Sequence, residues 1–202
     1  MKFNQYYNYV MENITEAFDT KEYNLVPAGT PISLIIGRFN PWTKGHNALI
    51  KDARYPVVIG LVKSLKTSQD KNKNPFDFQL QKEIINRSNN PKIIDIVTIS
   101  SANIPQIISI LRDKGYEAKE LWAGTDRVLA YKRQIESYLS RINSDLKLKI
   151  LKRKEDDPDI AGISATKLRK AIKNSDYQSA NNMMIGLDKD LFDRMYKIMM
   201  SH

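Results

Sequence analysis

Short apolar runs alternate with amphipathic stretches through the middle of this 202-residue chain. The apolar runs lie at 32–36, 56–62, 93–99, 120–123 and 146–151. The stretches with helical periodicity lie between them, at 45–53, 76–88, 103–114 and 127–141. Parallel strands that helices cover on both faces have this near-continuous apolar character. We therefore predict an α/β fold with an open parallel sheet of about five strands and helices on both faces.

Helical periodicity also extends to both ends of the chain. Apolar side chains recur at helical spacing over residues 3–18, and a linker punctuated by prolines and a glycine follows. From residue 164 onward the pattern is helical again. We predict a single domain over 1–202. It is divided into an N-terminal helix and linker over 1–30, a core over 31–173 and C-terminal helices over 174–202.

The composition excludes several kinds of site. The chain has no cysteine, which excludes disulfides, thiolate catalysis and cysteine-based zinc sites. Only one histidine, His46, lies inside the chain, which excludes a histidine-rich metal site. No apolar run approaches ~18 residues, and the N-terminal residues lack the pattern of a signal peptide. We therefore expect a cytoplasmic protein that does not bind a membrane.

The net charge of +9 favours an anionic partner, either nucleic acid or the phosphates of a nucleotide. A lysine-rich surface that only keeps the protein soluble explains the same charge. Residues 63–74 hold four lysines against one aspartate and follow the carboxyl end of a predicted strand. Ligands of open α/β sheets bind at that edge, although a solvated loop has the same composition.

The stretch GRFNPWTKGH, which begins at Gly37, has the features of an anion site. Gly37 permits a close turn after the first strand, and Pro41 fixes φ where the chain leaves the sheet. A helix that starts near Thr43 or Lys44 would present free N–H groups and a positive dipole end to a phosphate.

Thr43 and His46 are three residues apart in this stretch, so their side chains share one face of the expected helix. The dipole at a helix N-terminus disfavours imidazolium, and we therefore interpret His46 as a neutral hydrogen-bonding partner. Local capping or packing by His46 remains the alternative.

The later stretch GISATKLRKAI has a similar organisation. Ser164 is a candidate N-cap, and Thr166 and Arg169 lie three residues apart on one face of the helix that follows. Such a helix start can hold phosphate oxygens, although an ordinary capped surface helix has the same pattern. In LWAGTDR, Gly124 ends a strand, and Asp126 can accept from ribose hydroxyls or cap the next helix.

Taken together, these stretches resemble a known family. GRFNPWTKGH resembles the G-x-F-x-P-x-[HT]-x-G-H signature of the nucleotidylyltransferase superfamily, and ISATKLR resembles its I-S-[ST]-T-x-x-R motif. The resemblance covers about residues 32–173. With NPF at 74–76, the chain is most similar to nicotinamide-mononucleotide adenylyltransferases, particularly archaeal-type sequences. AGTDRVL is similar to an element of their bacterial members, and the overall sequence resembles nucleotidylyltransferases of large tailed bacteriophages. Many members have histidine where this chain has Thr43.

The resemblance implies a Rossmann-like fold and transfer of AMP from ATP to nicotinamide mononucleotide, which gives NAD and pyrophosphate. Catalysis would consist of positioning and charge stabilisation while the acceptor attacks the α-phosphorus in line. Mg²⁺ would arrive with ATP. The cytoplasm is then that of the cell or of an infected host. Relatives often assemble, which makes a homo-oligomer possible, and nicotinic acid mononucleotide stays open as the acceptor.

The resemblance also implies roles for individual residues. The residues expected to be catalytic are His46, Thr43 and Arg169. Those expected to bind nucleotide or phosphate are Gly37, Arg38, Phe39, Asn40, Lys44, Gly124, Asp126, Ser164 and Thr166. No protein metal ligand is expected. Trp42 and Trp122 are candidates for stacking on a base or on nicotinamide, although for Trp122 packing in the core is favoured over stacking.

The sequence allows two other functions. A cytidylyltransferase that acts on a phosphorylated alcohol would use the same motifs with different pockets. A nucleic-acid-binding module on the same fold would explain the charge of +9. It would not explain why both phosphate-binding motifs are present, so we do not expect nucleic acid as the partner.

Overall fold

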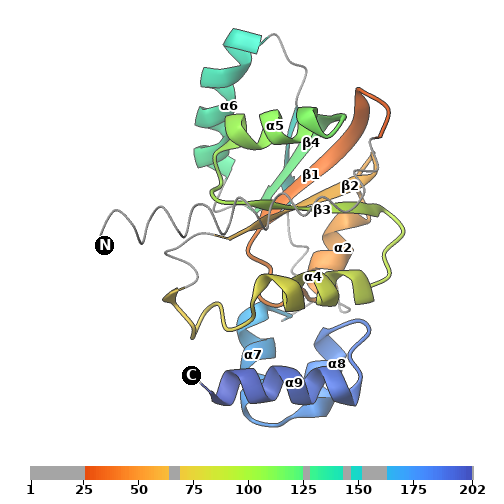
Figure 1. Ribbon diagram of the computed structural model, residues 1–202, viewed down its shortest axis with the longest axis vertical. Coiled ribbons are helices and arrows are strands. Elements are labelled where there is room, and N and C mark those ends of the chain that lie inside the picture. The colour runs from red at the N-terminus through yellow and green to blue at the C-terminus, as the bar shows by residue number, and fades with distance from the viewer. Residues whose placement is uncertain (1–25, 64–68, 125–127, 143–146, 152–162, 202) are drawn as a thin grey trace.

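The computed structural model describes residues 26–63, 69–124, 128–142, 147–151 and 163–201. These residues form a five-stranded sheet of strand order β3-β2-β1-β4-β5, in which every pair of neighbours is parallel (Figure 1). The strands are β1 (Thr30–Gly37), β2 (Val57–Val62), β3 (Ile93–Ile99), β4 (Tyr116–Gly124) and β5 (Lys147–Leu151). The predicted α/β, Rossmann-like fold is confirmed. The helix predicted over 3–18 lies outside the described residues.

The helices follow the predicted alternation with strands. They are α2 (Lys44–Ile50), α4 (Phe78–Arg87), α5 (Ile104–Asp113), α6 (Val128–Ile142), α7 (Ala165–Lys173), α8 (Tyr177–Met183) and α9 (Lys189–Met200). Strand β4 begins four residues before its predicted start. Its first half alternates the buried side chains of Tyr116 and Ala118 with the charged Glu117 and Lys119, so it does not form a continuous apolar run.

Two hydrophobic clusters cover the two faces of the sheet. Ile35, Ile59 and Leu61 face one cluster, which also contains residues of α2, α4, α7, α8 and α9. Leu34 and Leu121 face the other cluster, which is completed by α5 and α6. Figure 1 shows α5 and α6 on one side of the sheet and α2, α4 and the C-terminal helices on the other. Helices on both faces are what the buried strands predicted.

The C-terminal helices belong to the first of these clusters and are fixed to α4. In α9, Leu191 and Phe192 are buried, which places this helix face in the core of the protein. Across the surface, Arg87 Nη1 lies 2.6 Å from Asp188 Oδ2, and Gly186 is so close to the Arg87 carbonyl that a Cβ there would lie 2.4 Å from its oxygen. The position of α7 is therefore tied to that of α4 through α8 and α9.

Glu120 is a buried charged residue in the middle of β4, at 4% exposure. Its Oε2 accepts hydrogen bonds from Ser33 Oγ at 2.8 Å, from Trp122 Nε1 at 3.2 Å and from the Arg54 backbone N–H at 3.3 Å. Burial alone would raise the pKa of Glu120, but these bonds and the charge of Lys149 lower it overall. The carboxylate therefore joins β1, β4 and the loop before β2.

No described helix is long and apolar enough to cross a membrane.

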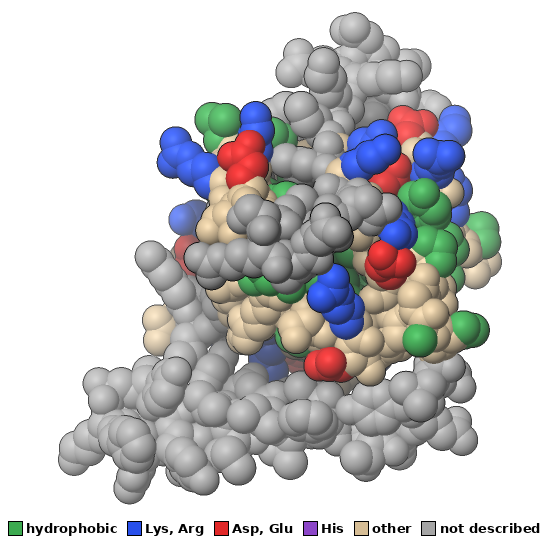
Figure 2. Space-filling view, turned by 90° about the horizontal axis from the view of Figure 1, so that it is seen from above, with side chains coloured by type: hydrophobic (Ala, Val, Ile, Leu, Met, Phe, Trp, Pro, Cys, Tyr) green, Lys and Arg blue, Asp and Glu red, His purple; other side chains and the backbone are tan. Residues whose placement is uncertain are grey.

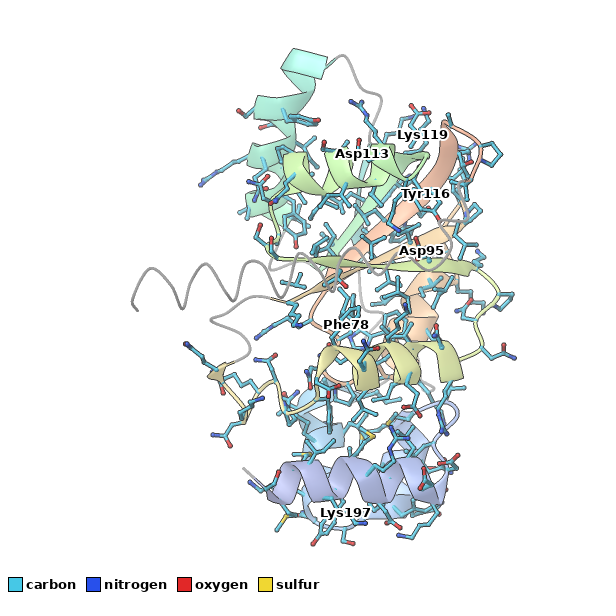
Figure 3. The ribbon with its side chains drawn as sticks, in the orientation of Figure 1. Phe78, Asp95, Asp113, Tyr116, Lys119 and Lys197 are labelled. Carbon is cyan, nitrogen blue, oxygen red and sulfur yellow. The ribbon has the colours of Figure 1, made fainter. Side chains whose placement is uncertain are left out.

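Tyr116 provides a test of this packing in alkaline solution. Its hydroxyl donates to Asp95 Oδ2 at 3.3 Å, and burial followed by the charge of Asp95 raises its pKa to about 12 (Figure 3). An unfolded tyrosine titrates near pH 10. The folded state thus holds the proton more tightly than the unfolded state. The resulting contribution to the unfolding free energy is fully present below pH 10 and is lost as the pH rises to 12.

We expect urea denaturation to show a steeper loss of unfolding free energy between pH 10 and 12 in the wild type than in Tyr116→Phe. The difference is on the order of 2 kcal/mol. Tyr138→Phe, on α6, is the matched control and should follow the wild type. Equal pH slopes for all three proteins would contradict the assignment.

Candidate active site

The loop between β1 and α2 folds back over the end of its own strand. The ring of Phe39 lies against Gly37, where a Cβ atom would come within 2.6 Å of the ring. Phe39 itself has a left-handed backbone with φ of 43°, which is uncommon for a residue with a side chain. Only glycine at position 37 leaves room for this arrangement. The residues that follow, 40–43, are all buried.

His46 is held by its own helix and by two aromatic rings. Its Nδ1 accepts the backbone N–H of Thr43 at 3.0 Å, and Thr43 Oγ1 lies 3.0 Å from the same nitrogen. Because a backbone N–H can only donate, Nδ1 carries a lone pair, and the proton of the neutral ring is on Nε2. The rings of Phe39 and Trp42 lie 5.2 and 5.1 Å from the imidazole centroid. The imidazole therefore offers a donor of fixed orientation.

This packing changes the expected roles of Thr43 and Trp42. Thr43 is 1% exposed, and its hydroxyl faces His46. Trp42 is 3% exposed within the core, so the expectation that it stacks on a ligand is wrong. The sequence did not reveal this because a tryptophan in a loop has the same pattern whether it is buried or exposed. Trp122 is only partly buried, and its indole N–H donates to Glu120.

Asn40 joins the loop to the segment that contains NPF. Its Nδ2 donates to the Phe76 carbonyl at 2.8 Å, and its Oδ1 accepts the Phe76 N–H at 3.2 Å. Gln81 Nε2 donates to the same carbonyl at 2.8 Å. One N–H and the oxygen of the Asn40 amide are therefore used within the protein, and the predicted contact of Asn40 with nucleotide stays a prediction.

The second motif meets the first at this loop. Ser164 caps α7 by accepting the Lys167 N–H at 3.1 Å, as the sequence predicted. Arg169 Nη1 then donates to the Asn40 carbonyl at 2.6 Å, and its Nη2 donates to Thr166 Oγ1 at 3.2 Å. Arg169 and Asn40 are 129 positions apart in the chain. The fold has brought the two sequence motifs into direct contact.

Two guanidinium groups share this region. Burial, and then the charge of Arg38, lower the pKa of Arg169, while Asp70 acts in the opposite direction. The pKa of Asp70 is lowered first by a hydrogen bond from Lys73, which outweighs desolvation, and further by Arg38. Mutual repulsion between Arg38 and Arg169 makes this a place where a bound anion would be stabilised. From the sequence, Asp70 was only the single acid in a lysine-rich segment.

The remaining expected residues lie at the same edge or outside the described part. Gly124 ends β4, the neighbour of β1, and Lys44 begins α2. At Gly45, a Cβ would lie 3.9 Å from Ile163, so the starts of α2 and α7 lie close together. Asp126 lies outside the described residues, and its predicted contact with ribose remains a prediction.

The described residues contain no cluster of side chains that could bind a metal ion directly. No group of three or more histidine, cysteine, aspartate or glutamate side chains that could hold an ion occurs there. The donors gathered at the site are cations and hydroxyl groups, which favour an anion rather than a bare cation. The described residues of this site therefore suit an anionic ligand.

In sequence, the chain matches no family model and no curated protein. In structure, it is similar to the nicotinic acid mononucleotide adenylyltransferase of Plasmodium falciparum complexed with NaAD, with a TM-score of 0.54 and 13% identity over 83% of this chain and 95% of that chain. The same enzyme complexed with APC gives 0.50 with equal identity and coverage. A protein of Vibrio parahaemolyticus, described provisionally as a nicotinate-nucleotide adenylyltransferase, gives a TM-score of 0.50. Its sequence identity is 13%, and the match covers 82% of this chain and 98% of that chain. These similarities show a shared fold.

The contact between Gly37 and Phe39 can be tested by adding one methyl group. Gly37→Ala forces the buried Phe39 ring away from its contacts, and we expect a loss of about 1–3 kcal/mol in unfolding free energy. Gly45→Ala is the matched control because its Cβ would meet only ordinary contacts of 3.5 Å or more. Urea denaturation should show destabilisation in the first variant alone. Equal behaviour of the two would mean that the ring moves at no cost.

Proposed function

We propose that the protein is an adenylyltransferase that transfers AMP from ATP to nicotinamide mononucleotide, giving NAD and pyrophosphate. The observation that carries the proposal is the contact of Arg169 with the loop that contains Arg38 and leads into α2, the helix of His46. It creates a cationic site at the carboxyl edge of a parallel sheet, where ligands of such folds bind. A triphosphate is an anion that matches two guanidinium groups.

The chemistry requires no covalent intermediate. A phosphate oxygen of the acceptor attacks the α-phosphorus of ATP, a new P–O bond forms, and the bond to the bridging oxygen of pyrophosphate breaks. Arg38 and His46 Nε2–H stabilise charge on the α- and β-phosphates, and Arg169 with Thr166 holds the β- and γ-phosphates. Thr43 acts through His46, whose orientation it fixes.

Magnesium enters this proposal as a companion of ATP. It would neutralise phosphate charge, and it needs few protein ligands because it retains several waters. The residues of the chain supply the remaining positive charge. Lys44, Lys71 and Lys73 lie in or next to the segments that carry Arg38 and Asp70.

The acceptor is the least constrained part of the proposal. The relatives of similar fold are named for nicotinic acid mononucleotide, and one is complexed with NaAD. A pyridine mononucleotide is therefore the acceptor class that we propose. The amide form follows from the sequence resemblance, and the acid form follows from those relatives.

Pyrophosphate release tests the proposal directly. ATP and CTP should each be paired with nicotinamide mononucleotide, nicotinic acid mononucleotide and glycerol 3-phosphate in the presence of Mg²⁺. We expect turnover with ATP and a pyridine mononucleotide. Turnover with CTP and glycerol 3-phosphate alone would make the protein a cytidylyltransferase. No turnover with any pair would refute both assignments.

Nucleic-acid binding is the alternative from another functional class. Among the described side chains on the face seen in Figure 2, basic and acidic ones lie next to one another. Binding through many phosphates would also weaken steeply with added salt, which a filter-binding titration would detect.

His46 should contribute to the transition state through Nε2. His46→Ala is expected to lower kcat by roughly 10²-fold or more, by analogy with the loss of one preorganised donor. His46→Asn can replace the acceptor for the Thr43 N–H but cannot place a donor at the Nε2 position. It should therefore be as slow as the alanine variant in the same pyrophosphate assay. If the asparagine variant recovers most of the activity, His46 serves only as a cap.

Arg169 should act mainly in binding of the triphosphate. Arg169→Ala is expected to weaken ATP binding by about tenfold or more, since a hydrogen bond to a charged group is lost. Lys170→Ala, at an exposed position next to it, should change the affinity less than twofold. Isothermal titration with ATP measures both. An unchanged affinity in Arg169→Ala would remove this residue from the site.

A further inference from the structure

Asn40 connects three segments of the candidate site. Its carbonyl accepts from Arg169 of α7 at 2.6 Å, and its side chain makes two hydrogen bonds with the backbone of Phe76, at 2.8 and 3.2 Å. Asn40 is 5% exposed and Phe76 is 3% exposed. These bonds therefore form away from water, where an unpaired polar group is costly.

The guanidinium of Arg169 depends on this carbonyl for its orientation. A guanidinium is planar and has five N–H donors. One donor on each of two nitrogens is used, by the Asn40 carbonyl and by Thr166 Oγ1, and these two bonds fix the plane of the group. The donors that remain then point in a set direction. A carbonyl that moves would release this plane, and the donors would no longer converge on one anion.

The Asn40 carbonyl is held in place from the opposite side of the loop. Phe76 accepts from both Asn40 and Gln81, and Gln81 is itself a buried residue of α4. The preceding residue, Phe39, has the unfavourable φ of 43° and gains nothing from regular secondary structure. The Asn40 side chain therefore provides the polar anchor that keeps the loop backbone in this position.

We infer that Asn40 is a positioning residue, which orients Arg169 for a polyphosphate ligand and does not bind that ligand with its side chain. This inference rests on the proposed function only for the identity of the ligand. Binding of a polyphosphate needs no turnover, so the inference can be tested separately from the reaction.

The experiment is a double-mutant cycle between positions 40 and 169. Binding of inorganic tripolyphosphate and of ATP is measured by calorimetry in the wild type, Asn40→Ala, Arg169→Ala and the double variant. We expect Asn40→Ala to weaken binding about five- to tenfold, as for one lost hydrogen bond. In the absence of Arg169, the same change should have less than a twofold effect, because no guanidinium is left to orient.

A matched control separates positioning from stability. Tyr116→Phe removes the bond to Asp95 at the amino end of β4, away from Arg169 and Asn40. It should be destabilised in thermal denaturation and bind tripolyphosphate within twofold of the wild type. Asn40→Ser, which also removes the amide but adds no charge, repeats the cycle if the alanine variant does not fold.

Additive effects of the two substitutions would overturn the inference, since they would show that Asn40 acts independently of Arg169. An unaltered affinity in Asn40→Ala, or no binding of tripolyphosphate by the wild type, would also overturn it. A coupled cycle in a protein that turns over none of the substrate pairs would support the inference and refute only the proposed reaction.

Discussion

The hydrogen bond from Arg169 to the carbonyl of Asn40 connects the two halves of the candidate site. One partner lies on the loop after the first strand and the other on a helix that follows the fifth. Because Arg169 bonds to the backbone carbonyl of Asn40, this bond depends on the path of the loop and not on the Asn40 side chain itself. What holds that path is a set of buried contacts around Gly37, Phe39 and Asn40. The positions of the charged groups in the site therefore depend on the packing of this loop.

The first turn of α2 shows how a partly buried polar group acquires a fixed chemical form. His46 accepts a backbone N–H at Nδ1, and this contact alone determines which ring nitrogen carries the proton. The signature that this stretch resembles has histidine or threonine at the position of Thr43. In this chain the Thr43 hydroxyl lies 3.0 Å from His46 Nδ1. Tautomer and orientation therefore come from the first turn of α2 and from two aromatic neighbours.

The sequence was sufficient for the succession of strands and helices along the chain, because buried parallel strands are apolar and the helices between them have helical periodicity. It predicted the cap of α7 at Ser164. It also identified both motifs. It could not show that Trp42 is buried, nor that Asn40 is bound to Phe76, because both depend on contacts between distant segments. The position of Asp70 beside two arginines was hidden for the same reason. Hydrophobic periodicity indicates which face of a single helix or strand is buried, whereas these contacts join several segments of the chain.

The contacts of Arg87 in α4 with Gly186 and Asp188 affect how the position of α7 is determined. Helix α7 is placed by its shared core with α8, α9 and α4 and by the bond of Arg169 to the first loop. Its position thus depends little on the length of the connection that precedes it. Chains with this sheet can then gain or lose residues between β5 and α7 while the arginine returns to the same place. The architecture separates the geometry of the site from the spacing of its motifs.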